Sequence, residues 1–110
     1  MAYDEDLADR IRAAIPDPEA VTERRMFGGL AFLVNGHLAV SASSQGGLLL
    51  RVDPAETDSF VNDDDVTRFT MRGRDLNGWL HVHPSATDSD EELRRWVEIG
   101  VAYAGSLPSK

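Results

Sequence analysis

The sequence of 110 residues contains no cysteine, and lysine occurs only once, at Lys110. The absence of cysteine excludes disulfide scaffolds, thiolate zinc sites and cysteine nucleophiles. No hydrophobic run approaches the roughly 20 residues that a membrane span requires. The start, Met1–Asp6, has neither a basic stretch nor an apolar run, which argues against a signal peptide. These absences predict a soluble cytoplasmic protein with no membrane contact.

Acidic side chains dominate the charge: 19 Asp and Glu face 11 Lys and Arg, for a net charge of −8. Proteins that hold nucleic acids use clustered basic residues to neutralise phosphates. Here the basic islands are short, with Arg24-Arg25 in one and Arg72 and Arg74 in the other. Composition therefore argues against direct DNA or RNA binding, and the alternative would depend on these four arginines.

Length and composition predict one folded domain over residues 1–110. A chain of this size buries roughly 65% of the surface that its unfolded form exposes, enough for a core without metal or disulfide help. The hydrophobic fraction of 42% is typical of globular proteins.

Two helices are indicated at the ends of the chain. Near the start, Leu7, Ile11 and Ile15 recur at helical spacing, and Pro16 ends the pattern. Near the end, Ser89-Asp90-Glu91-Glu92 fits a capping box. An apolar stripe at helical spacing follows it, and its tryptophan is predicted to lie in the core: Leu93, Trp96, Val97, Gly100, Val101 and Ala104. A short third helix is predicted from Pro54 to about Val61, with proline near its first position.

Strand patterns fill the space between the helices. The predicted strands are Val21–Met26, Leu30–Val34, His37–Ala42, Leu48–Val52, Val66–Arg72 and Trp79–His83. Asn35-Gly36 predicts a tight hairpin turn, and Asn77-Gly78 predicts a second. The fold class is therefore α+β, with two layers. We expect an antiparallel sheet of about five to six strands, flanked by an N-terminal helix, a short middle helix and a long C-terminal helix.

The Asn35-Gly36 turn also predicts the register of its hairpin. Val34 lies opposite His37, Leu33 opposite Leu38, and Phe32 opposite Ala39. One face then carries Ala31, Leu33, Leu38 and Val40, and the other carries Leu30, Phe32, Val34 and Ala39. Because both faces are apolar, we expect one of them to be covered by helices and the other by a second subunit or a ligand.

Histidines offer the one candidate metal site. His81 and His83 alternate along a strand, so they share a face with Trp79, and His37 could approach from a neighbouring strand. A polar outer face explains the same pattern. The glycine pairs Gly28-Gly29 and Gly46-Gly47 match no phosphate-binding motif and are interpreted as turns or bulges. No catalytic set and no cofactor are predicted. Trp79 could line a groove or a subunit contact.

Several motifs together resemble a known family, the N-terminal domain of the TfoX/Sxy competence regulators. The motifs of the first half are Arg25-Met26-Phe27-Gly28-Gly29, the hairpin Leu30–Val40, and Leu49-Leu50-Arg51-Val52-Asp53. Those of the second half are Gly73-Arg74, Gly78-Trp79, Leu93–Tyr103 and Ser106-Leu107-Pro108. The resemblance covers nearly the whole chain. It implies a compact α+β fold and a role as a co-regulator of DNA-uptake genes that works with other transcription factors. Full-length members carry a second helical domain, so the resemblance also predicts a stand-alone N-terminal domain.

The leading hypothesis is therefore a non-enzymatic regulatory domain that acts by protein–protein contact, with a homodimer as one form of that contact. We predict its interaction surface on six residues: Arg25, Met26, Phe27, Gly28, Gly29 and Trp79. The alternative is a small-ligand or metal-dependent enzyme that uses His37, His81 and His83, and it requires the three imidazoles to converge.

Overall fold

The computed structural model describes residues 4–26, 29–43, 46–62, 64–71 and 73–108. Its helices are α1 (Glu5–Ala14), α2 (Thr57–Phe60) and α3 (Asp90–Ser106). Its strands are β1 (Val21–Met26), β2 (Gly29–Val34), β3 (His37–Ala42), β4 (Leu48–Arg51), β5 (Val66–Met71) and β6 (Arg74–Val82). Short 3-10 turns are η1 (Pro18–Ala20), η2 (Pro54–Glu56) and η3 (Pro84–Ala86).

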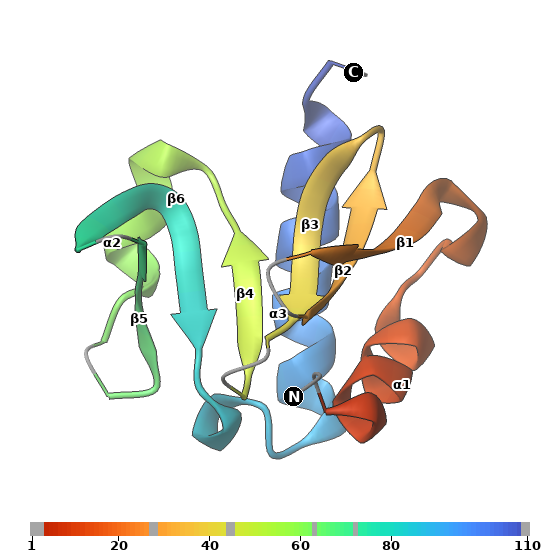
Figure 1. Cartoon of the computed structure of the whole chain (residues 1–110), viewed down its shortest axis with the longest axis horizontal. Coiled ribbons are helices and arrows are strands. Elements are labelled where there is room, and N and C mark those ends of the chain that lie inside the picture. The colour runs from red at the N-terminus through yellow and green to blue at the C-terminus, as the bar shows by residue number, and fades with distance from the viewer. Residues whose placement is uncertain (1–3, 27–28, 44–45, 63, 72, 109–110) are drawn as a thin grey trace.

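All six strands form one antiparallel sheet in the order β1-β2-β3-β4-β6-β5. Helix α3 packs along one face of β2, β3 and β4, and α1 packs against α3 on the same side (Figure 1). The short helix α2 packs beside β6. The predicted α+β class, with its three flanking helices, is confirmed.

Each long helix begins at a residue whose side chain accepts free backbone N–H groups, and the predicted cap at Ser89 is confirmed. The Asp4 carboxylate accepts from the amides of Asp6 and Leu7 at the start of α1. At the start of α3, the Ser89 hydroxyl accepts from the Glu92 amide at 3.1 Å and donates to the Glu92 carboxylate. Caps of this kind each stabilise a protein by about 1 kcal/mol.

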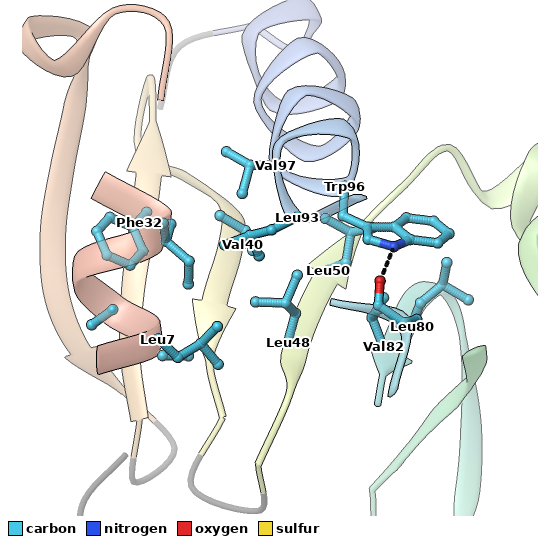
Figure 2. Close-up of a cluster of buried hydrophobic side chains, with 14 of the residues drawn as sticks. Leu7, Phe32, Val40, Leu48, Leu50, Leu80, Val82, Leu93, Trp96 and Val97 are labelled. Carbon is cyan, nitrogen blue, oxygen red and sulfur yellow. Dashed lines mark hydrogen bonds between the residues drawn. The ribbon is translucent and has the colours of Figure 1, made fainter. Parts of the chain in front are cut away.

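The main core lies between the sheet and the two long helices (Figure 2). Phe32, Leu50 and Leu80 reach it from the sheet and are fully buried, and Leu93 reaches it from α3. Each such side chain contributes about 1.5–3 kcal/mol through burial. Trp96 closes one end, and its indole N–H donates to the Ala86 carbonyl at 3.2 Å, as the dashed line in Figure 2 shows. The prediction that Trp96 is a core residue is confirmed.

A β-bulge changes the predicted register of the central hairpin. Two predicted pairs are confirmed, Val34 with His37 and Leu33 with Leu38. Phe32 pairs with Val40 and not with Ala39, because Ala39 is an extra residue in β3. Val40 therefore packs with Phe32 in the core beneath the helices, and its predicted place on the opposite face is wrong. Ala39 packs against Ala104 of α3.

The second face of the hairpin is also buried by the chain itself. Ala31, Leu33, Leu38 and Leu49 form a separate cluster with exposed fractions of 0–8%. Half-buried Phe69 and Trp79 pack against this cluster. Sheet twist provides the cover, since β1 crosses in front of β2 and β3 on the side away from α3 (Figure 1). The expectation that one face needs a second subunit or a ligand is therefore wrong.

Asn77 and Gly78 lie within β6 and do not form the predicted turn. The chain reverses at Gly73, and β6 is longer than expected because it begins at Arg74. Gly78 has a φ of 86°, which places its backbone against the segment that follows β4. Its N–H donates to the Thr57 hydroxyl at 2.8 Å, and its carbonyl accepts from the Val52 amide at 2.9 Å. Positive φ here serves a junction between elements and not a hairpin.

An ion pair joins α1 to the edge strand β1. The Arg12 guanidinium donates to both Glu23 carboxylate oxygens, at 2.7 and 2.8 Å, and thereby lowers the pKa of Glu23. A carboxylate whose pKa is lowered by folding stabilises the folded protein at pH values above the ordinary glutamate pKa. This stabilisation is lost as the pH falls through the lowered pKa. We expect Glu23→Gln to reduce the free energy of unfolding by at most about 1 kcal/mol at neutral pH, since the pair is partly exposed.

The measurement is urea unfolding of both proteins at neutral pH and at a series of acidic pH values, because protonation of Glu23 removes the ion pair from the original chain. The difference should shrink as the pH falls. Glu19→Gln, at an exposed residue without an ion pair in the described part of the chain, serves as the control. A difference that grows on acidification would contradict the assignment.

Candidate interaction surface

Arg51 lies between two aromatic side chains where β4 ends. It pairs with Trp79 across the sheet, and its guanidinium carbon is 5.1 Å from the centroid of the Trp79 ring. The same carbon is 5.8 Å from the centroid of the Tyr103 ring, on α3. All three side chains are half-buried. A guanidinium over an aromatic face is held by the ring quadrupole, so the three side chains form one preorganised unit.

Tyr103 also lines a groove of about 430 Å³ between α3 and the η2–α2 segment. Five apolar or aromatic side chains line it: Val52, Phe60, Ile99, Ala102 and Tyr103. Two carboxylates also line it, from Asp53 and Glu56. A volume in this range suits a small ligand or the side chains of a bound peptide.

The charged groups lining the groove are both acidic. Asp53 uses one carboxylate oxygen to accept the Ala55 amide at 2.9 Å, which caps η2, while Glu56 is exposed. Within the described residues, neither carboxylate is in an ion pair, and no basic side chain lines the groove. The groove therefore combines apolar walls with two carboxylates, while the Arg51 guanidinium lies outside the lining, over the Tyr103 ring.

Arg25, from the predicted motif surface, lies on the opposite face of the sheet from Trp79. Arg25 is exposed on β1 and pairs with Leu30, a core residue beneath the helices, so it lies on the helix side of the sheet. Trp79 packs on the opposite face. Phe27 and Gly28 lie outside the described residues, as does the side chain of Met26.

Gly29 has a structural role. A Cβ atom at this position would lie 2.2 Å from the Ala42 carbonyl oxygen and 3.3 Å from the Ser41 hydroxyl oxygen. Strand β3 therefore passes too close to β2 for any side chain at residue 29. This close approach explains the second glycine of the motif without an interaction partner.

The three histidines do not converge. His37, at the start of β3, donates from its Nε2 atom to the Pro108 carbonyl at 2.6 Å. His81 hydrogen-bonds through Nε2 to the Gly46 carbonyl at 2.8 Å, beyond the other end of β3. The rings of His81 and His83 are neighbours, with centroids 4.2 Å apart, which confirms their predicted common face.

Strand β3 therefore separates His37 from the other two histidines. At about 3.3 Å per residue, a six-residue strand holds its ends roughly 17 Å apart. The described part of the chain contains no group of three or more His, Cys, Asp or Glu side chains that could hold a metal ion. The structure therefore does not bring His37 together with His81 and His83, a convergence that the enzyme alternative requires.

Sequence reasoning found Trp79 but missed Arg51, Tyr103 and the groove. A signal was present in α3, where Ile99, Tyr103 and Ser106 recur at i, i+4 and i+7, beside the stripe that faces the core. Arg51 gave no such signal, because its two ring contacts depend on how β6 and α3 are placed. Side chains of Trp, Tyr and Arg are the types that dominate binding energy at protein interfaces.

The six-stranded sheet and the helices on one of its faces define an α+β domain. Its candidate interaction surface consists of Arg51, Trp79 and Tyr103 beside the groove. A family model, the TfoX N-terminal domain, matches residues 14–104, and the chain belongs to that family. The family is one of non-catalytic regulatory domains. No curated protein and no solved structure matches the chain. No helix in the described ranges is both long and apolar enough to cross a membrane.

Proposed function

We propose that this chain is a non-enzymatic regulatory domain that acts by protein–protein contact through Trp79, Arg51 and Tyr103. The observation that carries the proposal is the half-buried arginine between two aromatic rings, next to an apolar groove. Aromatic and arginine side chains held in one arrangement lose little conformational freedom on binding, which favours their use as anchors. Family membership supports a regulatory role connected with competence.

The cellular setting of this role is part of the proposal. We place the chain in the cytoplasm as a single domain over residues 1–110, as a co-regulator that contacts another protein. Self-association is a second mode of contact, although two chains with a net charge of −8 each repel one another. The two-sided hairpin no longer supports it, because the chain buries both hairpin faces.

Direct contact with DNA is not part of the proposal. Arg24 and Arg25 are adjacent in β1, so their side chains point to opposite faces of the sheet. The pair therefore contributes two separate charges and not one patch. Arg72 lies outside the described residues, and Arg74 is exposed at the start of β6.

Affinity capture with Arg51→Ala and its control Arg94→Ala tests the contact surface. Arg94 is an exposed arginine on α3, away from the two rings. We expect Arg94→Ala to recover a protein partner as the original chain does, and Arg51→Ala to recover roughly tenfold less or lower, as for an interface hot spot. Quantitative mass spectrometry measures recovery, and thermal unfolding checks that both variants fold.

Equal recovery by the two variants would contradict the assignment of the surface. Failure of the original chain to recover any partner, together with a monomer by light scattering at micromolar concentration, would contradict protein contact altogether.

A further inference from the structure

We propose that the groove between α3 and the η2–α2 segment binds a short peptide segment of a partner protein, one that carries an aliphatic anchor flanked by lysine or arginine. This inference rests on the proposed function, because it specifies the chemistry of the partner. The inference adds a second binding site to the surface formed by Arg51, Trp79 and Tyr103. The groove is next to that surface, because Tyr103 contacts Arg51 and also lines the groove.

The lining of the groove selects the anchor. Phe60 and Ile99 are half-buried and pack against the main core, so their exposed parts form a rigid apolar wall. Val52 closes the floor and is fully buried. A groove of about 430 Å³ accepts one or two aliphatic side chains of a peptide and is too open to enclose a small ligand completely.

Charge selects the flanking residues. Asp53 and Glu56 supply two carboxylates on one side of the groove. Two basic residues beside the anchor would give each carboxylate an opposite charge at the solvent boundary, where the cost of desolvation is small. The net charge of −8 favours the approach of a basic segment from a distance.

The same charge argues against a second copy of this chain as the occupant. Its basic residues are 11 against 19 acidic ones, so a second copy brings net repulsion to an acidic groove. By contrast, the hollow between α1 and α3 already carries opposite charges, with Arg10 paired to Asp90. Of these two hollows, the groove between α3 and the η2–α2 segment is the one whose charged lining residues are all acidic and form no ion pair within the described residues.

Two variants of the groove test the proposal. The double variant Asp53→Asn/Glu56→Gln removes both charges, and asparagine keeps the oxygen that caps η2. The variant Ala102→Gln adds a side chain at an exposed residue that lines the groove. Matched controls are Asp17→Asn/Glu19→Gln, an exposed Asp and Glu at η1, and Ala13→Gln, an exposed alanine of α1.

The probe is a random twelve-residue peptide library displayed on phage and selected against the full chain. We expect enriched peptides to combine Leu, Ile or Val with Lys or Arg. A synthesised representative should bind the charge variant roughly tenfold more weakly, as two partly exposed ion pairs predict. It should lose binding to Ala102→Gln and bind both controls as it binds the original chain, measured by fluorescence anisotropy.

Each other outcome overturns the inference in a distinct way. Enriched peptides that are acidic, or that bind both groove variants unchanged, would overturn the groove and leave protein contact as the function. A concentration-dependent dimer that Ala102→Gln disrupts would show that a second copy of the chain occupies the groove. It would overturn the proposal that the occupant is a basic peptide segment of another protein. A selection that enriches no peptide would overturn the groove as a peptide site and leave protein contact, which affinity capture tests separately, as the function.

Discussion

Replacing Gly100 by alanine should destabilise the protein by about 2 kcal/mol, although the same change normally stabilises a helix. Gly100 lies within α3, which crosses the sheet there at close range. A Cβ atom at this position would lie 2.5 Å from the Ala39 carbonyl oxygen and 2.7 Å from a methyl carbon of Leu50. The Ala39 carbonyl belongs to the bulged backbone of β3 and cannot rotate away, so helix and sheet must separate.

Gly105→Ala is the matched control, five residues further along α3. The nearest atom to a Cβ there is a methyl carbon of Val34 at 3.7 Å, which is an ordinary contact. This substitution should stabilise the protein by up to about 1 kcal/mol through helix propensity, less towards the frayed end. Opposite signs in chemical denaturation would identify close packing as the cause, whereas equal effects would contradict the helix–sheet distance.

The Gly100 contact illustrates where prediction from sequence stops. Helical spacing placed Gly100 on the core stripe of α3, and the structure agrees. The facing residue could not be found in the same way, because Ala39 reaches α3 only through a bulge in β3. From a two-residue turn, the residue pairs of a hairpin are predicted by counting outward along both strands. One inserted residue in a strand moves every later residue of that strand to the other face of the sheet. Val40 was misplaced for this reason.

The sequence also did not show what covers the second face of the central hairpin. Alternation in the sequence identified Ala31, Leu33 and Leu38 as apolar residues on one face, and this is correct. It could not show that Leu49 from β4 joins them, nor that β1 crosses this side of the sheet. Twist accumulates over several strands and depends on their order, which hairpin signals do not determine. A local pattern therefore identified buried residues but not what buries them.

The candidate surface shows the same limit at longer range. Trp79 stood out because it shares a strand face with His81 and His83, but Arg51 and Tyr103 are separated from it by 28 and 24 residues of sequence. They meet because β4 pairs with β6 while α3 passes the end of β4. The glycine motif gave the opposite result. Its residues were easy to recognise, and the best described of them, Gly29, has a packing role.

Replacing Gly29 by alanine tests that role and should cost about 3 kcal/mol of unfolding free energy. The added Cβ would lie 2.2 Å from the Ala42 carbonyl oxygen and 3.2 Å from its carbon, both backbone atoms. Since β2 and β3 are central strands, neither can move without disturbing the core around Leu30, which pairs with Ala42. Urea unfolding followed by tryptophan fluorescence measures the loss.

Arg25→Ala separates packing from interaction within the same motif. Arg25 is exposed, so its truncation should change the free energy of unfolding by no more than about 0.5 kcal/mol. If the motif acts mainly by packing, Gly29→Ala unfolds more easily while Arg25→Ala keeps both its stability and its recovery of a partner. A stable Gly29→Ala protein would contradict the packing role of Gly29. An Arg25→Ala protein that folds but no longer recovers the partner would show that the motif is part of the interaction surface. The two substitutions thus distinguish a glycine required by neighbouring backbone from a surface required by another protein.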